Sequence, residues 1–299
     1  MRVFPLALAV ACAAPTAVAL GDPVSTGIDL EHFVPGVGEG ALLGIDGAGP
    51  PARRFSLVAS LDHARGLLAV KNAFTQDTVS HPVRSLLAVD LAGDVSIGRR
   101  VSVGAGVPLA VGMTGDRLAG LGLGDEWALA AGVFGDLRLR LRVHVFGRPG
   151  IDVAALLVGT VPLGGQSQFF ATSGPTLEPR LLLGWTTARG WLRFVLETGL
   201  RVMPERHLYD LVYSHYLHQG LGLDFHVARP SVERVHLLLE LESGDSVTSN
   251  GTSWLEGRAG LRVRARTWLS VDVGVGGWAG AGPPGAPHPR LFTVVRIDT

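Results

Sequence analysis

Arginines alternate with aliphatic residues in two short runs of the chain, at 137–143 and 261–266. A row of guanidinium groups on one face of an extended strand binds anions or pairs with carboxylates. The rows therefore have two interpretations, an anion-selective strip or charge balance against neighbouring Glu and Asp side chains. The arginines concerned are Arg138, Arg140, Arg142, Arg262, Arg264 and Arg266.

A serine and two histidines lie together in the segment 213–218, Tyr-Ser-His-Tyr-Leu-His. Such residues occur in hydrolases and metal sites, but a hydrolase requires Ser, His and an orienting group to converge. His215 and His218 differ in strand phase, so we expect them to point to opposite faces and predict no catalysis there. His63 and His81 are predicted to be turn and loop residues, not ligands.

Other motifs of catalysis or cofactor binding are missing from the sequence. It contains no G-x-S-x-G, no H-E-x-x-H, no zinc spacing of Cys and His, and no phosphate-binding loop. The glycine-rich stretches 36–40 and 120–124 lack the strand-to-helix setting of a dinucleotide site, so they are predicted to be loops. We expect no catalytic residue, no cofactor, no metal and no enzymatic activity.

The elements that carry these side chains follow a period of two. Between Leu137 and Val145 aliphatic residues alternate without a break with Arg138, Arg140, Arg142 and His144. This period indicates β-strands with one apolar and one charged face. No amphipathic helix or second sheet pattern is evident to cover so many apolar faces. A closed antiparallel transmembrane β-barrel solves the problem, because lipid covers the outside and closure pairs all backbone groups.

The first residues resemble an export signal. Met1-Arg2 forms a short positive region, an apolar stretch follows to Val18, and Ala17-Val18-Ala19 matches an A-x-A cleavage site. We expect a signal peptide at 1–19, a periplasmic segment at 20–39 and an outer-membrane barrel at 40–299. Cys12, the single cysteine, lies within this leader; a lipoprotein-type leader is the alternative.

Composition excludes several classes of function. Lys plus Arg equals Asp plus Glu at 26 each over 299 residues, so no net field recruits nucleic acid. Beyond the leader no apolar run reaches the roughly 18 residues of a helical membrane span. The hydrophobic residues instead occupy alternate positions, which is typical of barrel strands.

Turn signals divide the chain into strand candidates whose connections alternate between short and long, as in outer-membrane barrels with short periplasmic turns. If 53–62 ends in a short turn at 63–66, Gly40–Ile45 must supply a leading strand, and fourteen strands follow. Twelve strands are the alternative, if 40–45 and 67–73 do not form regular strands. The candidates are 53–62, 67–73, 83–97, 101–111, 136–146, 151–163, 177–186, 191–203, 213–227, 232–242, 253–264, 267–277 and 289–298.

The strand phase assigns charged residues of both signs to the lumen. Such a lumen either fills itself with Arg–carboxylate pairs or leaves a wetted path lined by arginine, and the sequence does not choose between them. The predicted lumen-lining residues are Arg138, Arg140, Arg142, Arg193, Glu197, Arg201, Glu240, Arg258, Arg262 and Arg264.

Four motifs in order resemble the amino-terminal barrel of myxobacterial and related outer-membrane protein A (OmpA) family proteins. They are Asp29-Leu-Glu-His-Phe-Val-Pro35, residues 101–109, Gly135-Asp-Leu-Arg-Leu139 and Leu177-Glu-Pro-Arg-Leu-Leu182. The resemblance covers nearly the whole mature chain and implies a Gram-negative outer-membrane barrel without catalytic residues. It also implies a following peptidoglycan-binding domain, which we do not expect here because the sequence ends at Thr299. The last strand lacks the terminal aromatic residue that barrel-assembly machinery usually reads.

Two functions follow as hypotheses. In the first, the protein is a structural barrel or a passive porin-like channel for small solutes. In the second, it is a closed-lumen barrel that presents long loops at 112–135, 164–176 and 278–288 to a partner. A soluble secreted β-sandwich is a third interpretation. The expected partners are outer-membrane lipid and, during biogenesis, the barrel-assembly machinery; nucleic acid is not expected, and the oligomeric state and any solute are left open.

Overall fold

The structure is a computed structural model of the 299-residue chain. It describes residues 33–51 except 39, and then 55–71, 78–116, 128–129, 131–164, 169–172, 174–208, 211–227, 235–247, 253–278 and 289–299. The predicted signal peptide and residues 20–32 lie outside the described residues. Among the described residues, no helix is long and apolar enough to cross a membrane.

The described secondary structure consists of β-strands. Their bounds are β1 Phe55–Lys71, β2 Thr78–Ile97, β3 Val101–Thr114, β4 Val133–Phe134, β5 Asp136–Arg148, β6 Ile151–Pro162, β7 Thr176–Thr186, β8 Leu192–Arg201, β9 Arg206–Leu208, β10 Leu211–Tyr213, β11 Tyr216–His226, β12 Val235–Ser246, β13 Trp254–Arg266, β14 Leu269–Trp278 and β15 Arg290–Asp298.

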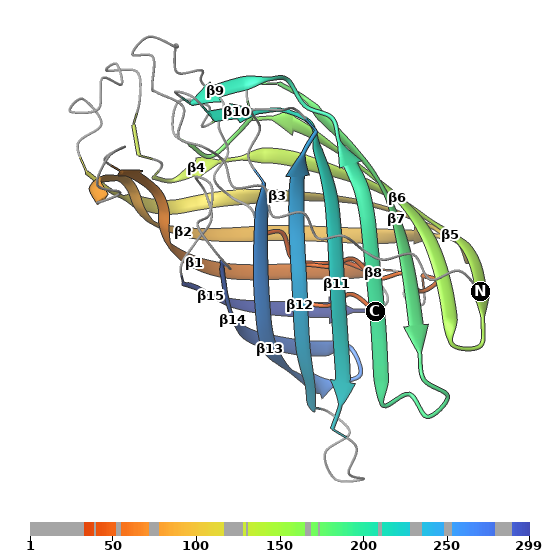
Figure 1. The fold of residues 1–299 in the computed structure, drawn as a ribbon. Coiled ribbons are helices and arrows are strands. Elements are labelled where there is room, and N and C mark those ends of the chain that lie inside the picture. Colours follow the sequence, from red (N-terminus) through yellow and green to blue (C-terminus); the bar gives the residue numbers. More distant parts are fainter. Residues whose placement is uncertain are drawn as a thin grey trace, which may run out of the picture.

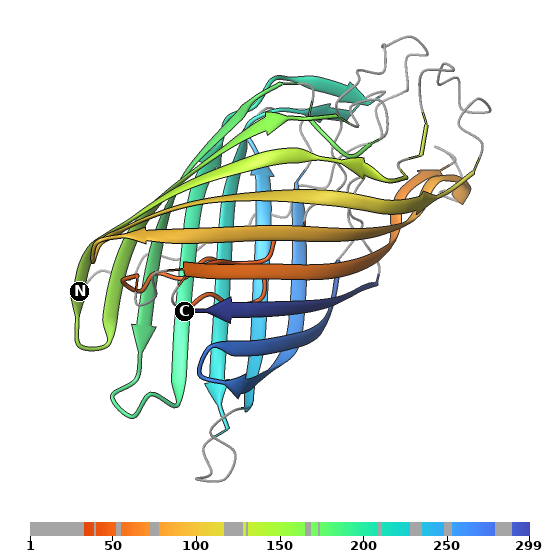
Figure 2. The same ribbon diagram turned by 180° about the vertical axis from the view of Figure 1, so that it is seen from behind.

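Twelve long antiparallel strands close into a ring (Figures 1 and 2). Each long strand pairs with its neighbours in chain order, and β1 closes the ring by pairing with β15, from Ser56 opposite Asp298 to Ala64 opposite Arg290. The short β4 lies just before β5 and pairs with Leu109 and Ala110 of β3. The short strands β9 and β10 pair with each other in a separate two-stranded sheet. Closure of this kind leaves no free sheet edge, which is the requirement for strands in lipid. The predicted closed barrel is confirmed, with twelve strands and not fourteen.

Two local predictions account for the difference in strand number. Residues 40–45, expected as a leading strand, form no strand and lie inside the barrel. Residues 63–66, expected as a turn, lie within β1: residues 63–65 pair with β2, and the register shifts after Arg65. Ala64 is buried, and Asp62, just before this stretch, points into the lumen and pairs with Arg290. The expected strand 53–62 would have ended at a short turn. In the structure, β1 instead begins on the side of the barrel where the short turns lie.

The alternating pattern places its two faces as predicted. On β5, Leu139 and Leu141 are 48% and 42% exposed, whereas Arg138 and Arg142 are each 5% exposed. Exposed aliphatic side chains on the outer face continue around the ring on β7, β12, β13 and β14. An apolar outer band and a charged interior are the pattern of a membrane barrel.

Substitution of Leu139 by arginine tests the assignment of the outer face. We expect Leu139→Arg to lower the free energy of unfolding by about 2–4 kcal/mol in lipid vesicles, because it places a charge in the hydrocarbon. The measurement is the denaturant midpoint of the vesicle-inserted protein, and Leu139→Ile is the control. Equal midpoints for the two variants would contradict a lipid-facing position.

The two ends of the barrel differ in their connections. At one end, here called the short-turn end, β2 and β3, β5 and β6, and β13 and β14 are joined by two or three residues. Gly98 and Gly150 in these turns have φ of +73° and +83°, which glycine adopts without steric cost. The amide of Thr299 donates to Phe55 O at 2.9 Å, so β15 ends where β1 begins, at this same end.

Candidate functional site

The lumen contains a segment that precedes the first strand, the described residues 33–38 and 40–51, which we call the plug. The red-orange trace of the plug runs within the ring of strands (Figures 1 and 2). Its apolar side chains are almost completely buried and pack against inward-facing Val58, Val195, Leu238 and Val294. The buried apolar residues of the plug are Phe33, Val37, Ala41, Leu42, Leu43, Ile45 and Ala48.

Hydrogen bonds within the plug fold it into a compact loop. The amide of Gly36 donates to Leu43 O at 2.9 Å, and that of Gly47 donates to Val37 O at 3.1 Å. The Val37 amide donates to Oδ1 of Asp46 at 2.7 Å. No described residue of the plug pairs in the barrel sheet, so its remaining backbone groups need partners from side chains of the wall.

Carboxylates and arginines of the wall supply those partners. Glu240 on β12 accepts the amides of Gly44, at 2.9 and 3.0 Å, and Ile45, at 3.2 Å. Arg140 on β5 forms an ion pair with Asp46, and Arg142 donates to Gly47 O at 2.7 Å. Hydrogen bonds to charged groups are about twice as strong as neutral ones, so these contacts hold the plug.

A second group of contacts comes from β13, β14 and β15. Arg262 donates to Ala41 O at 2.9 Å, and Arg296 donates to Gly36 O and to Leu42 O. Asp272 on β14 holds both guanidinium groups, with bonds of 2.7 and 2.8 Å to Arg262 and 3.1 Å to Arg296. One fully buried carboxylate therefore positions two arginines that bind the backbone of the plug.

Phe33 anchors the beginning of the described plug. Its ring stacks on Phe292 of β15 with centroids 4.8 Å apart. The guanidinium carbons of Arg258 and Arg290 lie 5.3 and 5.5 Å from its centroid, within the range of cation–π attraction. Those arginines are held by carboxylates in turn, Arg258 by Glu256 at 3.0 Å and Arg290 by Asp62.

A further ion-pair network lies in the lumen beside β7, β8 and β11 and contacts Asp46 of the plug. Arg180 bonds Glu178 at 2.8 Å and Glu197 at 2.6 Å, and His218 Nε2 lies 2.8 Å from Glu197. Arg201 closes the network on Glu178 at 3.2 Å. Alternating signs neutralise this group internally, which is the charge-balance interpretation of a mixed lumen.

The ten residues predicted to line the lumen divide into three groups. Arg140, Arg142, Glu197, Glu240, Arg258 and Arg262 contact the plug, and Glu197 does so by accepting the Asp46 amide at 3.3 Å. Arg193 lies beside Gly40 of the plug. Arg138 pairs with Asp90, Arg201 with Glu178, and Arg264 is exposed at the short-turn end.

The serine and histidine residues of the 213–218 segment do not come together. Ser214 and His218 are buried, whereas His215 is exposed, as their strand phase predicts. His218 belongs to the ion-pair network of Glu178 and Glu197. His63 lies within β1 and His81 within β2, so the prediction of turn and loop positions is wrong for both.

The connection between β6 and β7 also folds inward. Phe169, Phe170 and Ala171 are fully buried, and the Thr172 hydroxyl donates to Asp136 at 2.7 Å. The 164–176 loop was expected to reach out to a partner, but its described residues 169–172 are buried. The other two long loops lie mostly outside the described residues.

A small polar cavity lies beside the plug, at the short-turn end. Its volume of about 100 Å³ is enough for a few waters. Gly38 and Gly40 of the plug line it together with Arg142, Arg264 and Asp298 of the wall. The plug and the wall side chains that bind it thus occupy the lumen next to this cavity.

Sequence reasoning missed the plug, and with it the roles of Phe33 and Asp46. One signal was available: apolar Val58, Leu238 and Val294 fall on the phase assigned to a charged lumen. Apolar residues on an inner face require an apolar partner inside the barrel, and the stretch 33–48 supplies it.

Comparisons with known proteins identify the fold. The chain is similar to a solved COG4313 outer membrane channel from Pseudomonas putida F1, with a TM-score of 0.62 and 12% identity over 83% of this chain and 96% of that one. It is also similar to the NanC porin, with a TM-score of 0.52 and 8% identity over 81% and 98% of the two chains. No protein-family model and no curated protein sequence matches it. The chain therefore has the fold of outer-membrane β-barrels.

Proposed function

We propose that the protein is an outer-membrane channel for small solutes that its own plug closes, and that it opens when the plug leaves the lumen. The short-turn end faces the periplasm, in keeping with the short periplasmic turns of such barrels. The protein is not an enzyme in this proposal. The resemblance to OmpA-type barrels agrees with an outer-membrane location, but the proposal of a channel does not depend on it.

The observation that carries this proposal is the chemistry of the contact between plug and wall. The wall meets the plug with Arg140, Arg142, Glu240, Arg262 and Arg296, which bind backbone groups and one carboxylate. These charged side chains would be hydrated once the plug left, so the emptied lumen would be a wet, charged path. A permanently filled interior is more stable with apolar packing than with buried charges.

The solved structures with the same fold also support a channel. One is an outer membrane channel and the other a porin. This proposal differs from the passive porin-like channel expected from the sequence, because here the docked plug blocks free diffusion through the barrel.

A closed-lumen structural or interaction barrel is the second candidate. It is favoured by the internally neutralised network of Glu178, Arg180, Glu197 and His218, which has no need of a solute. In that case the plug is a permanent part of the core and never leaves.

A reversible disulfide between plug and wall separates the two candidates. Ala48 Cβ lies 3.1 Å from the position that a Cβ on Gly184 of β7 would take. Disulfides need about 3.5–4.5 Å between Cβ atoms, so a shift of a few tenths of an ångström permits the bond. We expect the Ala48→Cys/Gly184→Cys variant to show no current in planar bilayers when oxidised. Discrete openings should appear on reduction.

Single-cysteine variants at the same two positions are the controls, and their currents should not respond to the reductant. The predicted mature chain has no other thiol, since Cys12 lies in the leader. Silence in both redox states would contradict a channel, and equal currents in both would contradict closure by the plug.

A further inference from the structure

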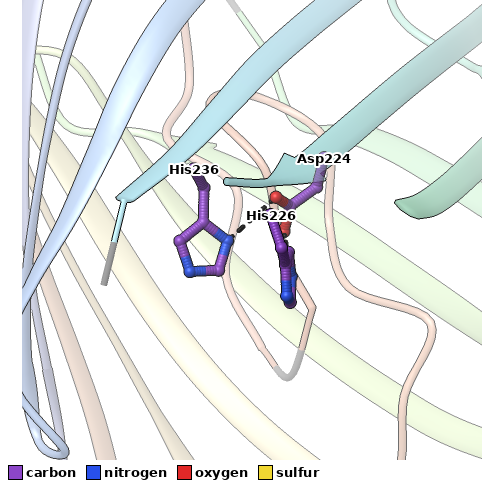
Figure 3. Close-up of side chains that lie close together, drawn as sticks. All are labelled: Asp224, His226 and His236. Carbon is purple, nitrogen blue, oxygen red and sulfur yellow. Dashed lines mark hydrogen bonds and ion pairs between the residues drawn. The ribbon is translucent and has the colours of Figure 1, made fainter. Parts of the chain in front are cut away.

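Two histidines and an aspartate meet inside the barrel near its short-turn end. Asp224 and His226 lie two residues apart on β11 and so share a face, and His236 lies directly opposite His226 on β12. Figure 3 shows the three side chains projecting together from these two strands. The β-ladder itself therefore brings three metal-ligating groups to one point.

The distances between their ligand atoms suit a small cation. His236 Nδ1 lies 2.9 Å from Asp224 Oδ1, and His226 Nε2 lies 3.5 Å from Asp224 Oδ2. One ligand atom from each residue can be chosen so that all three lie within 4.8 Å of one another. Ligands about 2.0–2.2 Å from a tetrahedral Zn²⁺ are roughly 3.4 Å apart, so small side-chain rotations complete the arrangement.

The burial of the three residues distinguishes a site from a surface cluster. Asp224 and His236 are 2% and 1% exposed, which fixes two ligands in place. The His226 side chain is 39% exposed, so an ion can enter from its side and keep a water as fourth ligand. Two strong cations lie directly across the ladders from these ligands. Arg262, opposite His236, is neutralised by a bidentate pair with Asp272. Arg193, opposite Asp224 on β8, donates to Thr186 Oγ1 at 3.3 Å and lies beside Gly40 of the plug.

The two imidazoles lie on opposite oxygens of one carboxylate. His236 is beside Oδ1 of Asp224 and His226 is beside its Oδ2. The two imidazole rings are 4.2 Å apart, so one ion can reach both of them together with the carboxylate.

We propose that Asp224, His226 and His236 bind one divalent transition-metal ion of the Zn²⁺ class. Two imidazoles with one carboxylate favour Zn²⁺, Cu²⁺ or Ni²⁺ over Mg²⁺ and Ca²⁺, which prefer all-oxygen sites. The ion joins β11 to β12 next to the plug, since Gly222, on the same face of β11, lies against Leu42.

Calorimetric titration of chelator-treated, untagged full-length protein in detergent with Zn²⁺ tests the proposal. We expect one equivalent to bind, and His226→Ala and His236→Ala to weaken binding by at least about tenfold, the loss that even an outer-shell change produces. His144→Ala is the matched control, because His144 pairs with Asp152 at 3.1 Å at the same end of another hairpin. It should bind Zn²⁺ like the parent.

Electron paramagnetic resonance with Cu²⁺ provides a second readout, in which nitrogen couplings from two imidazoles should fall to one in His226→Ala. Heat-modifiable migration in gels reports whether each variant is folded. If His236→Ala does not fold, the test rests on His226→Ala, because the His226 side chain is partly exposed and its loss is less disruptive to folding. The proposal is overturned if the parent takes up no stoichiometric Zn²⁺, or if His226→Ala binds it equally well.

Discussion

The double substitution Phe33→Ala/Asp46→Ala is expected to open the barrel to ions. Loss of the buried Phe33 ring removes its stacking on Phe292, at a cost of about 3–5 kcal/mol. Loss of Asp46 breaks its buried ion pair with Arg140 in the docked state, which costs about 3–5 kcal/mol more. Together these losses shift the equilibrium between docked and released plug by about four orders of magnitude or more. The measurement is the single-channel current in planar bilayers.

Pro50→Ala is the matched control, because Pro50 belongs to the plug but is exposed. It should open as rarely as the parent does. Each single variant should give an intermediate open fraction, since Phe33 and Asp46 contact different strands. If the double variant conducts no more than Pro50→Ala, the plug does not close the pore.

The second large effect is expected at Asp272, whose removal should destabilise the whole barrel. This carboxylate has no solvent exposure and holds Arg262 and Arg296 together. In Asp272→Ala two guanidinium groups remain buried without their counter-charge, which costs about 3–5 kcal/mol. The measurement is the urea midpoint of the protein in lipid vesicles, followed by tryptophan fluorescence.

An exposed ion pair provides the comparison for this prediction. Arg84 pairs with Asp116 at 2.7 Å, but its side chain is 61% exposed. Arg84→Ala should therefore cost no more than about 1 kcal/mol. Equal midpoint shifts for Asp272→Ala and Arg84→Ala would show that burial of the Asp272 network contributes nothing to stability.

Much of the fold could be predicted because barrel strands carry a local signal. The alternation at 137–145 determines which side chains point outward, and the exposures of Leu139 and Arg138 agree with it. The strand number was less secure, because a short polar stretch has the same composition in a turn and in a lumen-facing strand. At 63–66 the chain continues as a strand, in which buried Ala64 lies between Leu86 of β2 and Arg290 of β15, a neighbour that only ring closure supplies.

The candidate site could be predicted only in part. Period and phase placed Arg140, Glu240 and Arg262 in the lumen, but what they bind there depends on a segment before the first strand. Likewise, Asp224, His226 and His236 were assignable to the inner face. Their convergence depends on the register of β11 against β12, which the short segments do not encode by themselves.

The amino-acid sequence by itself determined the class of fold, the inner and outer faces, and the absence of known catalytic motifs, because each of these follows from the order of neighbouring residues. Only the tertiary structure decided that the ring has twelve strands, that the plug lies inside it, and which carboxylate holds which arginine. Those features arise from strand register and ring closure, which join groups as far apart as Gly36 and Arg296. No local pattern carries that information.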